Sequence, residues 1–156
     1  MPTSHALERA PHATRLPRWS TAGFLAGAAS VLVFHQAVVA IFFALGLTAR
    51  HPYALQPTGP WGVPQLWSLA FWGGVWGVLL AIALARLETL RLLVAATLFG
   101  AILPTLVAWF VVAPLKGQPM AGGFAVAAMA LAVVANGLWG FVTGLGLALF
   151  GRGRGG

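Results

Sequence analysis

Four long apolar stretches constrain the fold of this chain more than any other feature. A helix needs about 20 apolar residues to cross the hydrocarbon core of a bilayer. Four stretches reach that length, at roughly 22–47, 66–85, 91–113 and 122–149. Only 7% of the residues are charged, whereas a soluble domain carries roughly 25%. The sequence therefore predicts an all-α, polytopic membrane protein whose residues 21–150 form a four-helix transmembrane bundle.

Basic residues predict how the bundle is oriented. If the chain crosses four times, Arg50 and Lys116 lie on one side and the other seven bases on the opposite side. The seven are Arg9, Arg15, Arg18, Arg86, Arg91, Arg152 and Arg154. Because cytoplasmic loops carry the excess of Lys and Arg, both termini are predicted to be cytoplasmic (N-in/C-in). These bases sit at helix ends and lack interleaved aromatics, so the formal charge of +7 does not indicate nucleic-acid binding.

The segments outside the four stretches are of three kinds. Residues 1–20 are polar, basic and broken by prolines, and we expect a disordered cytoplasmic tail; the first apolar stretch is too long for a signal peptide. Residues 151–156 form a Gly/Arg tail suited to contact lipid headgroups. Residues 86–91 predict a tight hairpin. Residues 48–65 hold four prolines, and this longer loop either lies on the membrane surface or caps the bundle.

Glycines spaced four residues apart predict close helix packing. The pairs are Gly23 with Gly27, Gly73 with Gly77, and Gly140 with Gly144. Without a Cβ, two backbones approach closely, and dispersion contacts hold them together in lipid. We expect these seams to lie within the monomer, with a homodimer or a larger membrane complex as the alternative.

The second and fourth stretches also share a short pattern. Residues 74–78 (GVWGV) resemble residues 137–141 (GLWGF), 63 positions later. Either a helical hairpin is repeated in parallel, or the match is a chance result in a chain rich in Gly, Ala, Leu and Trp.

Polar side chains near the middle of the predicted spans are the candidate site. His35 and Gln36 lie in the first span, Thr105 follows Pro104 in the third, and Asn136 lies in the fourth. An unpaired polar group in hydrocarbon costs several kcal/mol, so a hydrogen bond from His35 or Gln36 to Asn136 is predicted. Two interpretations stay open. The cluster is a structural clamp, or His35 and its neighbours form a path for a proton or ligand.

Missing residue types limit the chemistry. The chain has no cysteine, and its acids, Glu8 and Glu88, lie outside the four spans. Paired carboxylates, a nucleophile triad, a nucleotide-binding glycine loop and a zincin helix are absent, so neither an enzyme nor a metal or other cofactor is predicted. A haem or metal would need a second strong ligand at the depth of His35. We expect a structural or accessory membrane protein; the alternative is a small transporter or channel for an apolar, neutral or anionic solute.

Three segments carry a resemblance. Phe34-His35-Gln36, Gly62-Val63-Pro64 and residues 71–77 (FWGGVWG) resemble those of small, uncharacterised four-helix proteins of the bacterial inner membrane. The resemblance runs from the first span to the fourth. It implies the same membrane and topology, and it implies no activity and no site residue.

Overall fold

The computed structural model describes residues 15–84 and 86–151 of the chain. It is 79% helical, and four of its helices are long and apolar enough to cross a membrane. They span Arg18–Ala44, Gln65–Leu84, Thr89–Leu115 and Val126–Phe150. The number of long helices therefore matches the four stretches predicted from the sequence.

Several of the long helices are composed of consecutive segments. The first contains α1 (Arg15–Ser30), the π-helical turn η1 (Val31–His35) and α2 (Gln36–Ala44), and the second is α3 (Gln65–Leu84). The third contains α4 (Thr89–Val107), the π-helical turn η2 (Ala108–Val112) and α5 (Ala113–Leu115). The fourth contains α6 (Val126–Gly146) and the π-helical turn η4 (Leu147–Gly151). Two short strands, β1 (Pro57–Thr58) and β2 (Val63–Pro64), pair antiparallel, and η3 (Met120–Phe124) precedes α6.

The helix bounds differ from the prediction at two places. The first helix already begins at Arg15, so residues 15–20 are helical and do not belong to the expected tail; residues 1–14 and 152–156 lie outside the described residues. The last long helix begins at Val126 and not near residue 122. Ala121, Gly122 and Gly123 have φ values of 49°, 63° and 69°, and this left-handed backbone cannot continue a right-handed helix.

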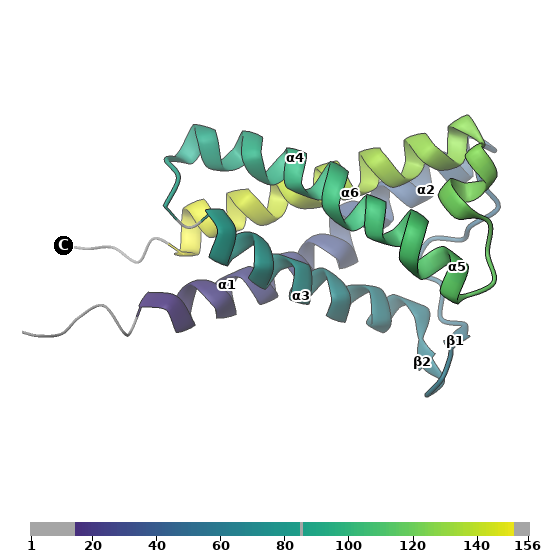
Figure 1. Cartoon of the computed structure of the whole chain (residues 1–156), viewed down its shortest axis with the longest axis horizontal. Coiled ribbons are helices and arrows are strands. Elements are labelled where there is room, and N and C mark those ends of the chain that lie inside the picture. Colours follow the sequence, from purple (N-terminus) through teal and green to yellow (C-terminus); the bar gives the residue numbers. More distant parts are fainter. Residues whose placement is uncertain (1–14, 85, 152–156) are drawn as a thin grey trace, which may run out of the picture.

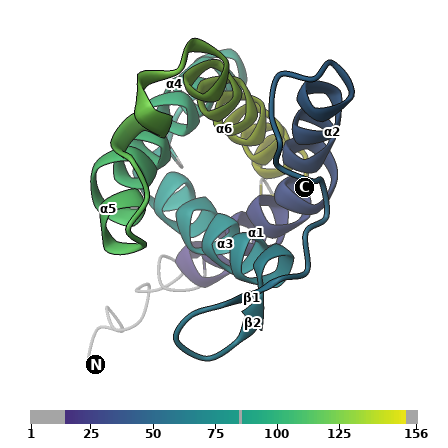
Figure 2. The same ribbon diagram turned by 90° about the vertical axis from the view of Figure 1, so that its right-hand side faces the viewer.

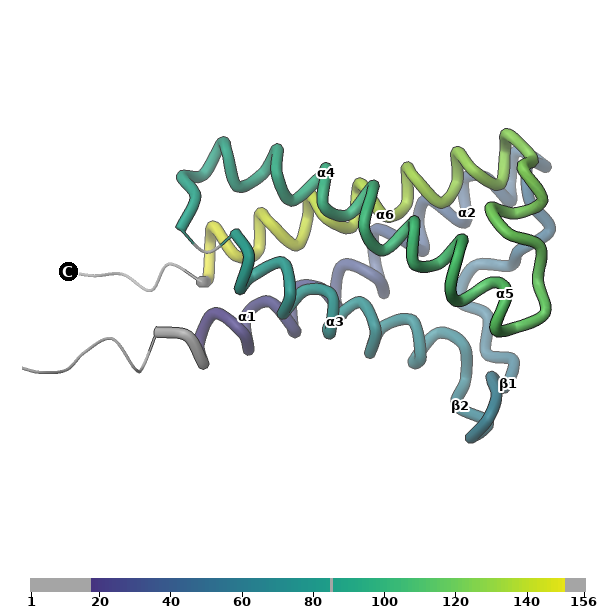
Figure 3. Tube along the Cα trace, in the orientation of Figure 1, coloured from purple at the N-terminus to yellow at the C-terminus, as the bar shows by residue number. Residues whose placement is uncertain are grey.

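The long helices run alongside one another and define two ends of the bundle (Figure 1). We call the end that holds residues 86–88 the hairpin end, and the start of α1 and the end of η4 lie there. We call the other end, which holds residues 45–64 and 116–125, the loop end. The trace in Figure 3 shows the same arrangement. The view along the bundle in Figure 2 shows the long helices arranged in a ring. The closest pairs are α1 with α3 and α4 with α6.

Glycines bring the helices of each close pair into backbone contact. A Cβ on Gly77 would collide with the carbonyl oxygen of Gly23, and one on Gly27 with that of Gly73. The second pair is built likewise, because a Cβ on Gly140 would collide with the carbonyl oxygen of Ala96. The glycine seams therefore lie inside the monomer, and a homodimer would need a different surface.

The two close pairs are equivalent in their packing. In the first pair of helices, Gly23 and Gly27 of α1 face α3. In the second pair, Ala96 and Gly100 of α4 face α6 in the same way, and they lie 73 positions later in the chain. Gly77 and Gly140 occupy matching positions 63 residues apart, which is the offset of the sequence pattern. Contacts between α1 and α6, and fewer between α3 and α4, join the two pairs. The chain is thus two similar helical hairpins packed side by side.

Candidate functional site

The predicted polar cluster is divided between two places. The Nδ2 group of Asn136 donates a hydrogen bond of 2.9 Å to Oγ1 of Thr105, which joins α6 to α4. Gln36 bonds elsewhere: its Oε1 accepts a hydrogen bond of 2.9 Å from the backbone N–H of Tyr53. The predicted hydrogen bond from His35 or Gln36 to Asn136 is therefore wrong.

The π-helical turn at 31–35 explains why the cluster divides. A π turn adds a residue to the helical repeat and so rotates everything after it relative to α1. The rotated segment α2 packs on α6 through Val38 and Val39, which contact Leu131 and Ala135. Gln36 precedes this contact and meets the loop at the loop end, while Asn136 faces α4.

Gln36 holds the loop of residues 45–64 over the loop end of the bundle. Its side chain is only 3% exposed, so its bond to Tyr53 is formed inside the protein. Tyr53 has φ 53°, and such a left-handed backbone costs about 1–3 kcal/mol in a non-glycine residue. The loop is also tied to the start of α3, because Leu66 donates its N–H to the carbonyl of Ala54 at 3.0 Å. Residues near Tyr53 and Ala54 thus form a cap, whereas the β1–β2 hairpin projects beyond the helices (Figure 2), with Trp61 87% exposed.

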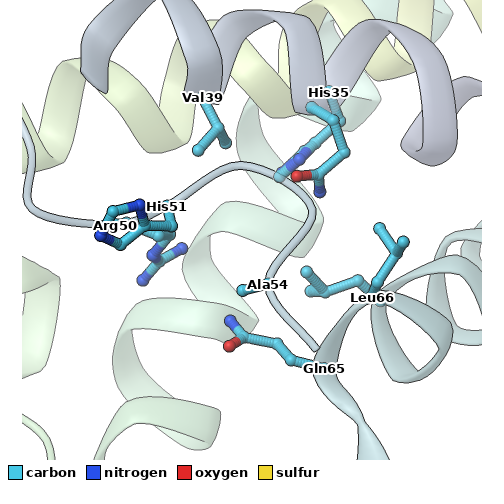
Figure 4. A pocket seen from close by; sticks show the side chains of 9 residues that line it. His35, Val39, Arg50, His51, Ala54, Gln65 and Leu66 are labelled. Carbon is cyan, nitrogen blue, oxygen red and sulfur yellow. The ribbon is translucent and has the colours of Figure 1, made fainter. Parts of the chain in front are cut away.

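A small cavity lies under this cap, and His35 faces it (Figure 4). Its volume is ≈ 10 Å³, which is about the space of one water molecule. The Nδ1 atom of His35 is buried and has no hydrogen-bond partner. The remaining polar lining is Gln36, Arg50, His51 and Gln65, and the apolar lining includes Val39, Leu66 and Leu69.

Two features of the cavity bear on its chemistry. The ring of His51 lies 4.5 Å from the ring of Phe43, measured between centroids, so the loop is anchored to α2 by a ring contact as well. The start of α3 forms part of the wall, and a helix N-terminus carries a partial positive charge. Histidine, arginine and glutamine thus meet at the loop end without a carboxylate among the lining residues.

Trp139 joins the two hairpins and is not among the residues predicted to form the site. It is only 2% exposed, and its Nε1 donates a hydrogen bond of 2.9 Å to the carbonyl oxygen of Gly27. Its own carbonyl oxygen accepts from Oγ of Ser30 at 3.2 Å and from Oγ1 of Thr143 at 2.7 Å. The repeated Trp-Gly pattern was the available signal, but the sequence does not tell which tryptophan turns inward.

An open apolar groove lies between the third and fourth long helices. It is lined by Trp109, Val126, Met129, Ala130, Val133 and Val134, and its volume is ≈ 490 Å³. These residues belong to η2 and to the loop-end half of α6, beyond the Asn136–Thr105 hydrogen bond. The groove is apolar, and its lining belongs to the third and fourth candidate membrane spans.

Comparisons with known proteins add no family to this description. The sequence matches no protein-family model, and neither a curated protein nor a solved structure matches it. The resemblance to small bacterial inner-membrane proteins consequently has no support from these comparisons. Within residues 15–84 and 86–151, no group of three His, Cys, Asp or Glu side chains is placed to hold a metal ion.

Proposed function

We propose that the chain is a small integral protein of the bacterial inner membrane with a structural or accessory role, a subunit or assembly partner of a larger membrane complex. Four helices long and apolar enough to cross a membrane support the location. The excess of basic residues at the hairpin end supports a cytoplasmic position for that end and for both termini.

The observation that most supports the accessory role is the tightly packed interface between the two hairpins. Trp139, Ser30 and Thr143 hydrogen-bond at the centre, and each of the three is at most 2% exposed. The polar cavity beside His35 has room for about one water molecule. Of the four polar groups expected to line a solute path, Asn136 and Thr105 bond to each other and Gln36 bonds to the loop. Nδ1 of His35 alone has no partner among the described residues.

The accessory role also requires a surface for a partner, and the apolar groove supplies one. Its side chains are partly accessible, with Val133 40% and Val134 48% exposed. In a bilayer, a partner helix in this groove would gain dispersion contacts of the kind that hold transmembrane helices together.

Photo-cross-linking in native membranes tests the role. We expect p-benzoylphenylalanine at position Val133 to give one discrete adduct heavier than the chain. The same group at Leu98, a residue of α4 that is 55% exposed and outside the groove, should give none. Equal labelling at both positions, or adducts with lipid only, would count against an accessory subunit.

A small transporter or channel for apolar, neutral or anionic solutes is the second candidate. The observation in its favour is the unpaired Nδ1 of His35 in a polar cavity at the loop end. Proteoliposomes that contain the purified chain would then take up such a solute faster than protein-free vesicles, and His35→Ala would abolish the excess. We expect no excess uptake.

A further inference from the structure

The cavity beside His35 carries positive charge that no described group balances. Arg50 and His51 both line it from the loop and are exposed on their outer sides. The only acid in the described part of the chain is Glu88, which lies at the opposite, hairpin end of the bundle. A guanidinium presents five N–H donors and no acceptor, so the cavity has more hydrogen-bond donors than acceptors.

The wall of the cavity adds further donors. The side-chain amide of Gln65 points from the start of α3 towards Arg50 and His51 (Figure 4). The same start of α3 contributes the positive end of a helix of 20 residues. On the opposite wall, the buried Nδ1 of His35 has no partner, and a neutral imidazole can place its proton on that atom. The donor side chains of Arg50, Gln65 and His35 therefore line one small space. The first N–H groups of α3 are already bonded to the carbonyls of Gln56 and Ala54, so this helix start contributes its partial charge and no free donor from those two residues.

The size of the space limits what these groups can bind. At ≈ 10 Å³ it admits one water-sized particle, so sulfate, phosphate and organic carboxylates are too large. Arg50 and His51 can move slightly to accommodate a particle somewhat larger than water, because their outer sides are exposed. A cation would meet Arg50 and no carboxylate. A water molecule satisfies Nδ1 of His35, whereas an anion at the same place also gains the charge-assisted attraction of Arg50.

We propose that the cavity formed by His35, Arg50, His51 and Gln65 binds a single halide ion of the size of chloride. The ion accepts hydrogen bonds from the Arg50 guanidinium and the Nδ1–H of His35, and it lies at the positive end of α3. Because Arg50 belongs to the same loop as Tyr53, the bound ion ties this loop to the bundle next to the bond with Gln36. Binding of the ion therefore stabilises the cap.

Thermal unfolding of the purified full chain in detergent micelles, followed by tryptophan fluorescence, tests the site. Chloride is titrated against gluconate at constant ionic strength, so that general screening by salt stays unchanged. We expect the unfolding temperature to rise with chloride and to saturate, because an ion that binds the folded state stabilises it by mass action. Sulfate at the same ionic strength should give no saturable rise, because its general stabilising effect comes from exclusion from the protein surface and not from binding.

Two variants and one control decide which residues hold the ion. Arg50→Gln removes the charged donor from an exposed loop position, and the half-saturating chloride concentration should increase about tenfold or more, as loss of a charge-assisted hydrogen bond implies. His35→Phe fills the space of the ring without a donor and should remove the saturable rise. Arg86→Gln, the same change at the hairpin end, should leave the titration as in the unchanged chain.

The proposal is overturned if chloride, sulfate and gluconate give the same unfolding temperature, as expected when only water occupies the cavity. It is also overturned if Arg50→Gln titrates like the unchanged chain. This second result decides the matter even if His35→Phe fails to fold, because Arg50 lies on the exposed loop and its replacement leaves the packed helices intact.

Discussion

Replacement of Gly77 by alanine should weaken the packing of α1 against α3. The added Cβ would collide with the carbonyl oxygen of Gly23 and would lie 3.2 Å from the Cα of Gly27. Both neighbours are backbone atoms, so no side chain can rotate away, and the helices must separate. Overpacking of this kind costs about 1–3 kcal/mol, and the better helix propensity of alanine returns at most about 1 kcal/mol. Because a backbone neighbour cannot yield, the upper part of the overpacking range applies, about 2–3 kcal/mol, and after the gain in helix propensity we expect a net loss of about 1–2 kcal/mol in the free energy of unfolding.

Gly137→Ala is the matched control for this prediction. Gly137 is also a buried helical glycine, but a Cβ there would meet only the Cβ of Ala101 at 3.5 Å, an ordinary van der Waals distance. Equilibrium unfolding in mixed detergent micelles with increasing dodecyl sulfate measures both variants. Gly137→Ala should be neutral or slightly stabilising. If the two variants unfold alike, the account of the glycine seams is refuted.

Three further predictions concern the polar groups. Trp139→Phe should lower the free energy of unfolding by about 1–3 kcal/mol, because a hydrogen bond and side-chain volume are lost. Trp67→Phe, at a side chain 56% exposed, should change it little in the same assay. Equal effects of the two substitutions would contradict a central role for Trp139. A double-mutant cycle of Asn136→Ala with Thr105→Val should give a coupling of about 0.6–1.7 kcal/mol, and zero coupling would show that their hydrogen bond contributes nothing. Gln36→Leu should speed amide hydrogen exchange in the loop of residues 45–64, because the loop loses its buried acceptor; exchange unchanged by the substitution would show that other contacts hold the cap.

The large-scale features of the fold follow from the sequence by simple physical rules. Span length gives four long helices, and the spacing of Gly23, Gly27, Gly73 and Gly77 identifies the seam between α1 and α3. The seam on α4 is not predicted from the sequence, because it is formed by Ala96 and Gly100, and an alanine–glycine pair is not distinctive in an alanine-rich stretch. Only the structure, in which glycines of α6 face Ala96 and Gly100, shows that this pair forms the contact between α4 and α6.

The details of the site do not follow from the sequence, for two reasons. Regular helical periodicity places His35 and Asn136 at similar depth and suggests that they meet, but the π turn at 31–35 rotates the helix and separates them. The loop partner of Gln36 is the backbone N–H of Tyr53, and a backbone group in a loop carries no signature of its partner in the sequence. The sequence therefore leaves two arrangements open for this loop, on the membrane surface or over the bundle, and its contact with Gln36 depends on its three-dimensional path.

Thiol accessibility tests most directly the central claim that the two hairpins enclose a closed interior. The chain contains no cysteine, so a single introduced thiol is the only reactive one. Ser30→Cys and Thr105→Cys place a thiol at buried positions that are each 1% exposed, and Ala49→Cys serves as an accessible control on the loop. We predict that a small water-soluble thiol reagent labels Ala49→Cys rapidly and leaves both interior thiols unmodified in the folded protein. Rapid labelling of Ser30→Cys or Thr105→Cys would reveal an aqueous path through the bundle and would contradict the accessory role.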